Sequence, residues 1–285
     1  MIIYEIIRNG DMMKKYLIGL DLDGTLLDDD VKIPIKTKQY LQKLKKHGHK
    51  IVILTGRPYR GCKEYYDELK LDTPLVCDNG SAIYGCREKD FNSVLLTIDK
   101  PIVDALFQFS KDHIVTAFYS VGDLLVTYKP QERLSFLYHR NEFTKMVEKP
   151  FDDPSLPVPY GIMIAIKVTF DEVFEDYIEN HTDGLLTYRC WGKDKNNAFY
   201  EIYQRRASKG DALLHIASFY GLEKEQLIAF GDGLNDKEML DVAHVGIKMI
   251  NGVDALDDVA DYITEYTNHE EGVMKFLKTF FKLNL

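Results

Sequence analysis

The apolar run in Tyr16-Leu-Ile-Gly-Leu-Asp-Leu-Asp-Gly-Thr-Leu-Leu27 ends in two acids. Tyr16–Leu20 suits a strand that is buried on both faces, as strands of a parallel sheet are. Asp21 and Asp23 follow at once, and residues two apart in an extended chain point to the same side. In open α/β sheets, ligands bind at the carboxyl ends of the strands. Two neighbouring carboxylates repel each other unless a cation lies between them or one is protonated, so the stretch predicts a divalent metal site, a nucleophile beside an acid/base, or both.

Two other interpretations fit a pair of acids in such a loop, a polar turn and a calcium-binding loop. A plain polar turn is possible, because Asp, Gly and Thr are all common in turns. A calcium-binding EF-hand loop requires Gly at its sixth position and Glu at its twelfth. Counted from Asp21, those positions hold Leu26 and Lys32, so the EF-hand is excluded.

Length and charge limit the class of protein. The chain has 285 residues, of which 45% are hydrophobic and 28% charged, enough for a large core and two domains. Its net charge of −9 provides no basic field for nucleic acid or an anionic membrane, so neither is expected as a partner. No apolar run reaches the length of a membrane span. The cysteines lack metal-type spacing and suit a reducing, cytoplasmic location; they are Cys62, Cys77, Cys86 and Cys190.

Residues 1–13 form a leader of uncertain role. Glu5, Arg8 and Asp11 break its apolar stretches, so it lacks the continuous apolar segment of a signal peptide. We expect this leader to be dispensable.

Strands and helices alternate on both sides of a long insert. Before the insert, the patterns predict these elements: a helix between Pro34 and Gly48, a strand at Lys50–Leu54, a helix ending near Leu69 and a strand at Leu75–Cys77. After it, they predict a helix at Lys209–Tyr220 capped by Ser208, a strand at Leu227–Phe230, a helix through Met239, a strand at Val245–Met249 and a helix from about Glu270 to Phe281. This alternation indicates a Rossmann-like, doubly wound parallel sheet.

The insert, residues 85–205, is richer in strands. Strands are expected near Val94–Ile98, Ile114–Tyr119, Leu124–Tyr128, Ile162–Phe170, Leu185–Trp191 and Phe199–Tyr203, and helices near Ile102–Lys111 and Val173–His181. Gly122-Asp123 suits a hairpin turn, and four prolines within Pro150–Pro159 indicate a loop. We therefore expect an α/β core of residues 14–84 and 206–285 and an inserted α+β domain with an antiparallel sheet.

Several polar side chains fall where predicted strands end or helices begin. They are Asp21, Asp23, Thr55, Lys209, Asp232, Asn235 and Asp236. Lys209 is unusual at a helix N-terminus, which prefers anions, so we expect an anion or a carboxylate beside it. Each feature alone could be a turn or a solvated side chain. Together they predict a magnesium and phosphate site in which one carboxylate attacks phosphorus and another transfers protons.

Four segments carry a family resemblance. Asp21–Thr25, Thr55–Pro58, Ser208–Gly210 and Gly231–Asp236 resemble, in order, the four motifs of the haloacid dehalogenase superfamily. The insert is similar to the type IIB cap of Cof-type sugar-phosphate phosphatases. Asn79-Gly80-Ser81-Ala82 resembles the same subgroup.

The resemblance implies a role for each motif residue. Asp21 would be the nucleophile and a metal ligand, and Asp23 the general acid/base, reaching the metal through its backbone carbonyl. Asp232 would complete the metal site, with Asp236 in support. Thr55 and Lys209 would hold the phosphoryl group during catalysis. The phosphate- and substrate-binding residues would be Leu22, Thr55, Gly56, Arg57, Lys209 and Asn235.

The leading hypothesis is a magnesium-dependent phosphatase of small phosphate monoesters, with sugar phosphates favoured. A phosphomutase of the phosphomannomutase kind shares this cap type and the acid pair. A non-catalytic phospho-ligand or protein-binding module is the third alternative, although binding alone requires no nucleophile beside an acid. The sequence leaves the particular phosphorylated metabolite and the oligomeric state open.

Overall fold

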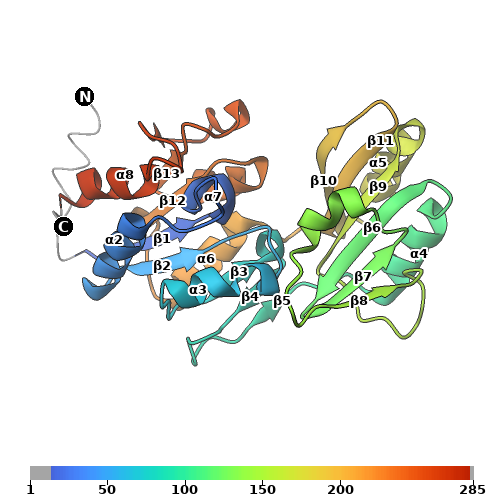
Figure 1. Cartoon of the computed structure of the whole chain (residues 1–285), viewed down its shortest axis with the longest axis horizontal. Coiled ribbons are helices and arrows are strands. Elements are labelled where there is room, and N and C mark those ends of the chain that lie inside the picture. The colour runs from blue at the N-terminus through green and yellow to red at the C-terminus, as the bar shows by residue number, and fades with distance from the viewer. Residues whose placement is uncertain (1–13, 283–285) are drawn as a thin grey trace. The chain divides into compact units, whose positions relative to one another are not determined.

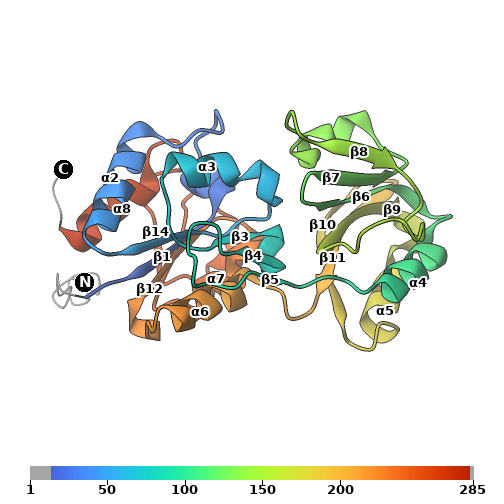
Figure 2. The ribbon, with the colours of Figure 1, turned by 90° about the horizontal axis from the view of Figure 1, so that it is seen from below.

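The computed structural model describes residues 14–282, which fall into two compact units (Figures 1 and 2). The first contains the described residues up to Gly56, Lys63–Ser93 and those from Ser208 onward. The second contains Arg57–Cys62 and Val94–Ala207. The leader, residues 1–13, lies outside the described residues.

A five-stranded parallel sheet in the order β14-β13-β12-β1-β2 forms the centre of the first unit. Its strands are β1 (Leu17–Leu20), β2 (Lys50–Ile53), β12 (Leu227–Gly231), β13 (Val245–Lys248) and β14 (Tyr262–Ile263). All residues of β1, β12 and β13 are buried, including Lys248 at the end of β13. The continuous apolar sequences of β1 and β12 suit strands that are covered on both faces. Leu20 at the end of β1 pairs with Phe230 of β12 and Ile53 of β2. The loops after these three strands therefore start side by side.

Helices cover both faces of this sheet. In Figure 2, α2 (Ile35–Lys46) and α8 (Gly272–Phe281) lie on one face, and α6 (Lys209–Phe219) and α7 (Lys237–Val242) on the other. The Ser208 hydroxyl accepts a 2.9 Å hydrogen bond from the backbone N–H of Asp211, so the predicted N-cap of α6 is correct. The doubly wound α/β fold is confirmed.

Strand β3 (Leu75–Cys77) departs from the prediction of a third strand in a continuous parallel sheet. A single parallel bridge between Leu54 and Val76 links this segment to the chain after β2. Its ladder is antiparallel, with β4 (Ala82–Tyr84). The chain reverses directly after β3 because Asn79 and Gly80 both adopt positive φ. The short helix α3 (Lys63–Glu68) precedes this hairpin.

The second unit contains a six-stranded sheet in the order β10-β11-β9-β6-β7-β8. Its strands are β6 (Ile114–Val121), β7 (Leu124–Tyr128), β8 (Lys145–Glu148), β9 (Gly161–Lys167), β10 (Leu186–Lys193) and β11 (Asn197–Gln204). The two-residue strand β5 (Val94–Leu95), which is not part of this sheet, begins the longer segment of the unit. Neighbouring strands are antiparallel, as predicted, except that β8 runs parallel to β7. Strand β8 was not predicted from the sequence, because its largely exposed Lys-Met-Val-Glu segment has little hydrophobic pattern.

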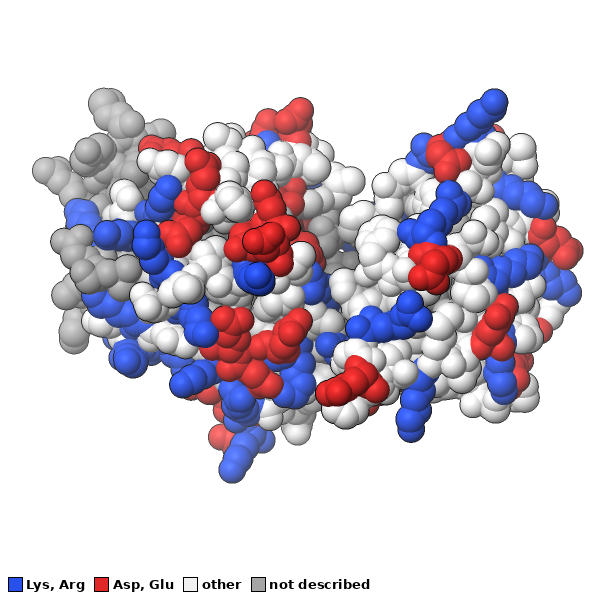
Figure 3. Space-filling view, viewed as in Figure 1, with Lys and Arg blue, Asp and Glu red and all other residues white. Residues whose placement is uncertain are grey.

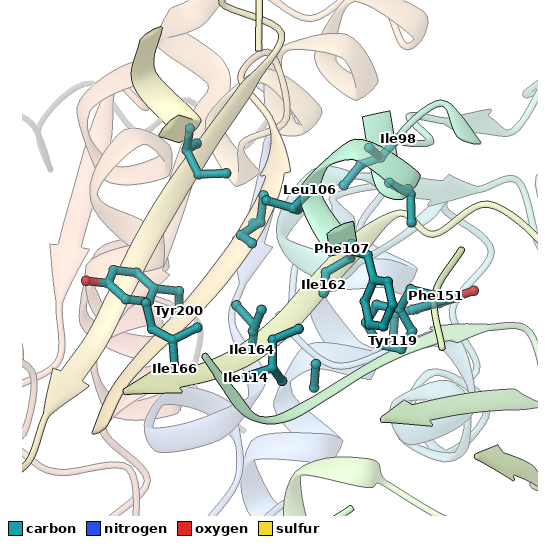
Figure 4. Packing of buried hydrophobic residues seen from close by; sticks show 14 of the residues in the cluster. Ile98, Leu106, Phe107, Ile114, Tyr119, Phe151, Ile162, Ile164, Ile166 and Tyr200 are labelled. Atoms are coloured by element: carbon teal, nitrogen blue, oxygen red, sulfur yellow. The ribbon is translucent and has the colours of Figure 1, made fainter. Parts of the chain in front are cut away.

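The helices of the second unit, α4 (Lys100–Ser110) and α5 (Asp171–Asn180), pack on the sheet around one apolar core. Figure 4 shows Phe107 of α4 among the side chains of Tyr119, Phe151 and Ile162. This packing confirms that the second unit is an α+β domain.

The segment Arg57–Cys62, which directly follows Gly56, belongs to the second unit. Arg60 is buried, and its guanidinium donates to Ser120 Oγ at 2.8 Å, the Tyr138 carbonyl at 2.6 Å and the Gly122 carbonyl at 3.2 Å. These bonds tie the segment to β6, to the hairpin turn that follows it and to the turn Glu132–Tyr138. The domain division expected from the sequence, a core of residues 14–84 and 206–285 with an insert of residues 85–205, assigns this segment to the core. In the structure the segment clusters with the second unit.

On the face shown in Figure 3, Lys and Arg side chains are interspersed with Asp and Glu. Within residues 14–282, no helix combines the length and apolar character that a membrane span needs.

Candidate active site

Three carboxylates converge where β1 and β12 end. Asp21 directly follows β1, Asp232 directly follows β12, and Asp236 closes the short turn Leu234–Asp236 before α7. Each offers an oxygen, and these oxygens lie within 4.8 Å of one another. The parallel pairing of β1 with β12 brings the acids together from positions more than 200 residues apart. An all-oxygen donor set of this kind suits Mg²⁺.

Lys209 lies against two of these acids. Its Nζ is 2.7 Å from Asp21 Oδ1 and 2.6 Å from Asp236 Oδ1, and the side chain is fully buried. Burial disfavours its charged form, but the carboxylates of Asp21 and Asp236 outweigh this and raise the pKa of Lys209. The lysine is thus held as an ammonium ion, and its place at the start of α6 is accounted for by the carboxylates beside it.

The single positive charge of Lys209 is not enough to neutralise three carboxylates. Burial raises the pKa of Asp21 well above its ordinary value; Lys209 opposes this rise, while Asp236 and Asp232 add to it. Burial, followed by the charge of Asp236, raises the pKa of Asp232 to about 7. A divalent cation between Asp21 and Asp232 would favour their ionised forms, so the residues present fit Mg²⁺.

Asp236 has both oxygens engaged by the protein. Oδ1 accepts from Lys209, and Oδ2 accepts from the backbone N–H groups of Asp232 and Gly233 at 2.9 and 3.0 Å. These bonds fix the start of the loop that carries Asp232. This geometry favours the supporting role expected for Asp236.

The turn Leu22–Leu26 packs on Asp232. Thr25 Oγ1 donates to Asp232 Oδ1 at 2.9 Å. Gly24 has φ +72°, and a Cβ at this position would lie 2.2 Å from Asp232 Oδ2, so only glycine fits. Asp23 is exposed at the start of the turn, whereas Leu22 is buried. The exposure of Asp23 suits a group that meets a substrate.

Asn79 links the other two loops of the site. Thr55 is buried, and its carbonyl accepts from the backbone N–H of Asn79 at 3.0 Å. The side-chain Oδ1 of Asn79 in turn accepts from Asn235 Nδ2 at 2.8 Å. A Cβ on Gly56 would lie 3.0 Å from the same Oδ1, so this glycine allows a close approach. Asn79 had no role assigned from the sequence, although it follows the end of β3.

Most predicted site residues are therefore joined in the first unit. Asp21, Lys209, Asp232 and Asp236 form the charged cluster, and Thr55 connects through Asn79 to Asn235. Arg57 belongs to the second unit, where its Nη1 donates to the Gly61 carbonyl at 3.0 Å.

Comparisons with known proteins agree over nearly the whole chain. A family model described as haloacid dehalogenase-like hydrolase matches residues 18–277. A Bacillus subtilis protein, 5-amino-6-(5-phospho-D-ribitylamino)uracil phosphatase YitU, is 33% identical over 271 residues, which cover 95% of this chain and 99% of that protein. A putative phosphatase of Buchnera aphidicola is 30% identical, with 83% of this chain and 86% of that protein covered.

Solved structures show the same fold. A haloacid dehalogenase-like hydrolase from Bacteroides thetaiotaomicron superposes with a TM-score of 0.78 at 25% identity, covering 93% of this chain and 99% of that one. The HAD subclass IIB sugar phosphatase BT4131 superposes with a TM-score of 0.76 at 22% identity, again covering 93% and 99%. The arrangement of a core and a separate cap sheet is thus shared with these proteins.

Proposed function

The chain belongs to the haloacid dehalogenase-like hydrolases, and we propose that it is a magnesium-dependent phosphatase of small phosphate monoesters that works through an aspartyl-phosphate. One observation carries this proposal: the buried ammonium of Lys209 contacts Asp21 within a cluster of three acids. Such a site offers a nucleophilic carboxylate, a fixed positive charge and oxygen ligands together.

In the first half-reaction, a carboxylate oxygen of Asp21 attacks phosphorus. The bond between phosphorus and the ester oxygen breaks as Asp23 gives its proton to that oxygen, releasing the alcohol. Lys209, with Thr55 and Asn235, holds the phosphoryl oxygens. Asp21, Asp232 and the Asp23 carbonyl would hold Mg²⁺, which when bound neutralises charge on the phosphoryl oxygens.

In the second half-reaction, Asp23 is a carboxylate and takes a proton from water. The water oxygen attacks phosphorus, and the bond to Asp21 breaks. Inorganic phosphate leaves, Asp21 is regenerated, and Asp23 carries the proton for the next cycle. The sum is ester plus water giving alcohol plus phosphate.

The relatives suggest which esters to test first. YitU and two further Bacillus subtilis relatives, 26% and 28% identical to this chain, are named for the phosphate ester of a ribitylamino-uracil. That substrate combines a sugar-derived alcohol with a heterocycle. We propose sugar and polyol phosphates as the substrate class, with this ester as the first candidate.

The four free thiols support a cytoplasmic location.

The decisive experiment compares the wild type with Asp21→Asn and with Asp241→Asn, the same substitution at an exposed aspartate outside the site, as the matched control. Phosphate release from a panel of phosphorylated metabolites is followed with Mg²⁺ and after chelation. We expect release by the wild type and the control with Mg²⁺ alone, and none above background by Asp21→Asn. Full activity of Asp21→Asn would contradict the nucleophile, and activity after exhaustive chelation would contradict the metal.

The phosphomutase alternative predicts a different product. With a hexose phosphate and its bisphosphate activator, phosphorus NMR would show a new phosphate ester in place of inorganic phosphate. A binding module would give neither product.

A further inference from the structure

Three hydrogen bonds from asparagines brace the turn Leu22–Leu26 and the residue after it. Asn251 Nδ2 donates to the Gly24 carbonyl at 2.7 Å. The backbone N–H of Asn268 donates to Asn251 Oδ1 at 3.1 Å. Asn268 Nδ2 donates to the Leu27 carbonyl at 2.8 Å. Both carbonyls that these side chains hold lie just beyond Asp23.

The amide of Asn251 has only one workable orientation. A backbone N–H can only donate and a backbone carbonyl can only accept. The oxygen of Asn251 must therefore face Asn268, and its NH₂ group must face Gly24. Because both ends are engaged, the side chain acts as a fixed spacer between two loops.

The loop that carries Asn251 is itself anchored on the metal site. It follows β13, and the backbone N–H of Val253 donates to the Asp232 carbonyl at 2.9 Å. A Cβ on Gly252 would lie 2.9 Å from Asp232 Cα, which shows how closely the two backbones approach. Asn251 therefore connects the turn Leu22–Leu26 to a loop that is itself hydrogen-bonded to the backbone of Asp232.

We propose that Asn251 is a positioning residue for proton transfer by Asp23, an inference that rests on the proposed function. Gly24 follows Asp23 directly and, at φ +72° and ψ −3°, lies in a region that glycine enters and leaves at little cost. The bond from Asn251 removes this freedom. Proton transfer requires the exposed Asp23 carboxylate to lie within hydrogen-bond reach of the leaving oxygen, so the backbone that carries it must be held in place.

The test uses leaving groups that differ in their need for a proton. When the P–O bond of an alkyl phosphate such as glycerol phosphate breaks, the alcohol would leave as an unstable alkoxide and so requires a proton from the acid. With p-nitrophenyl phosphate, the leaving group is a stable phenolate that needs no proton. The parameter is kcat/KM, which reports the steps up to release of the alcohol. For Asn251→Ala we expect a loss of about 10-fold with glycerol phosphate and less than about 2-fold with p-nitrophenyl phosphate.

Three companion variants complete the design. Asn251→Asp keeps the oxygen that faces Asn268 but has no NH₂ group for Gly24, so it should show the same selective loss. Asp23→Asn should show that selectivity more strongly. Ile250→Ala, at a half-exposed neighbour in the same loop, should leave both rates unchanged.

The outcomes separate this inference from the proposed function. If the wild type released no phosphate with Mg²⁺, the phosphatase proposal itself would fail. If Asp23→Asn were selective while Asn251→Ala lowered both rates equally, Asn251 would have a general structural role and positioning would be rejected. Unchanged rates in Asn251→Ala would reject it as well.

Discussion

Thr25 Oγ1 lies 2.9 Å from Asp232 Oδ1, so a hydroxyl from the turn after β1 orients an acid from the loop after β12. Asp232 is a proposed magnesium ligand, and groups that hold metal ligands contribute to metal affinity. For Thr25→Val, which keeps the shape but loses the hydroxyl, we expect the magnesium concentration for half-maximal activity to rise about 10-fold. Thr25→Ser should stay near the wild type. Equal magnesium dependence in Val and Ser variants would show that the bond has no such role.

Gly24 is expected to tolerate no side chain. In Gly24→Ala, the new Cβ would lie 2.2 Å from Asp232 Oδ2 and displace that carboxylate, so activity should fall about 100-fold. Gly122→Ala is the matched control, because Gly122 also has positive φ but nothing lies within 4 Å of its added Cβ. It should cost about 1 kcal/mol of stability and leave kcat unchanged. Comparable kcat losses in both variants would indicate backbone strain alone.

Removal of Lys209 should destabilise the protein in a metal-dependent way. Lys209→Met leaves Asp21 and Asp236 buried without their cation, which typically costs about 3 kcal/mol. Urea unfolding should show this loss in EDTA and a partial recovery at saturating Mg²⁺. Phosphatase activity should fall at least about 100-fold even with the metal. A loss of stability that Mg²⁺ does not change would argue against a cation beside these acids.

His49 should make the protein less stable in acid. Its Nδ1 accepts a hydrogen bond from the Tyr16 backbone N–H at 3.2 Å, and burial, with Lys15 and His47, lowers its pKa to about 4. The unfolded chain binds this proton near pH 6.5, so the contribution is complete above that pH and is lost as the pH falls towards 4. We expect His49 to account for roughly 2 kcal/mol of this loss.

The comparison that isolates this effect is His49→Asn, whose Oδ1 can still accept from Tyr16 but does not titrate. Urea unfolding of both proteins is measured between pH 7 and 4.5. The free energy of unfolding of the wild type should fall more steeply than that of the variant. Parallel curves would show that His49 is not the responsible group.

The site residues that could be predicted are those whose side chains are unusual where a strand ends or a helix begins. Asp21 and Asp232 stand out because they follow apolar runs, and Lys209 stands out because a cation is unusual at a helix N-terminus. The parallel pairing of β1 with β12 brings the two acids together, and Lys209 lies against Asp21. The N-cap at Ser208 could be predicted because one side chain and the next helical turn determine it. Such features depend on local sequence and on one topological rule.

The parts that were missed depend on contacts between distant loops. Asn79 stands out from the sequence only through a family resemblance, and its role becomes visible with its partner Asn235. Asn251 looks like an ordinary turn residue until its partner Gly24 is known. Asn251 does follow a buried strand, so the rule that identified Asp232 would have pointed to it. Strand β8 and the antiparallel hairpin of β3 were missed because short or polar segments leave the choice of partner to the tertiary structure.

The assignment of Arg57–Cys62 to the second unit has a consequence for building chimaeras. Exchange of Val94–Ala207 alone would carry Ser120, Gly122 and Tyr138 away and leave Arg60 behind, stripped of the acceptors it has here. A second unit taken from another protein would have to be transferred together with its equivalent of Arg57–Cys62. The second unit therefore consists of two separate segments of sequence. A chimaera made by exchanging only the longer segment would combine an Arg60 and a set of acceptors that come from different proteins.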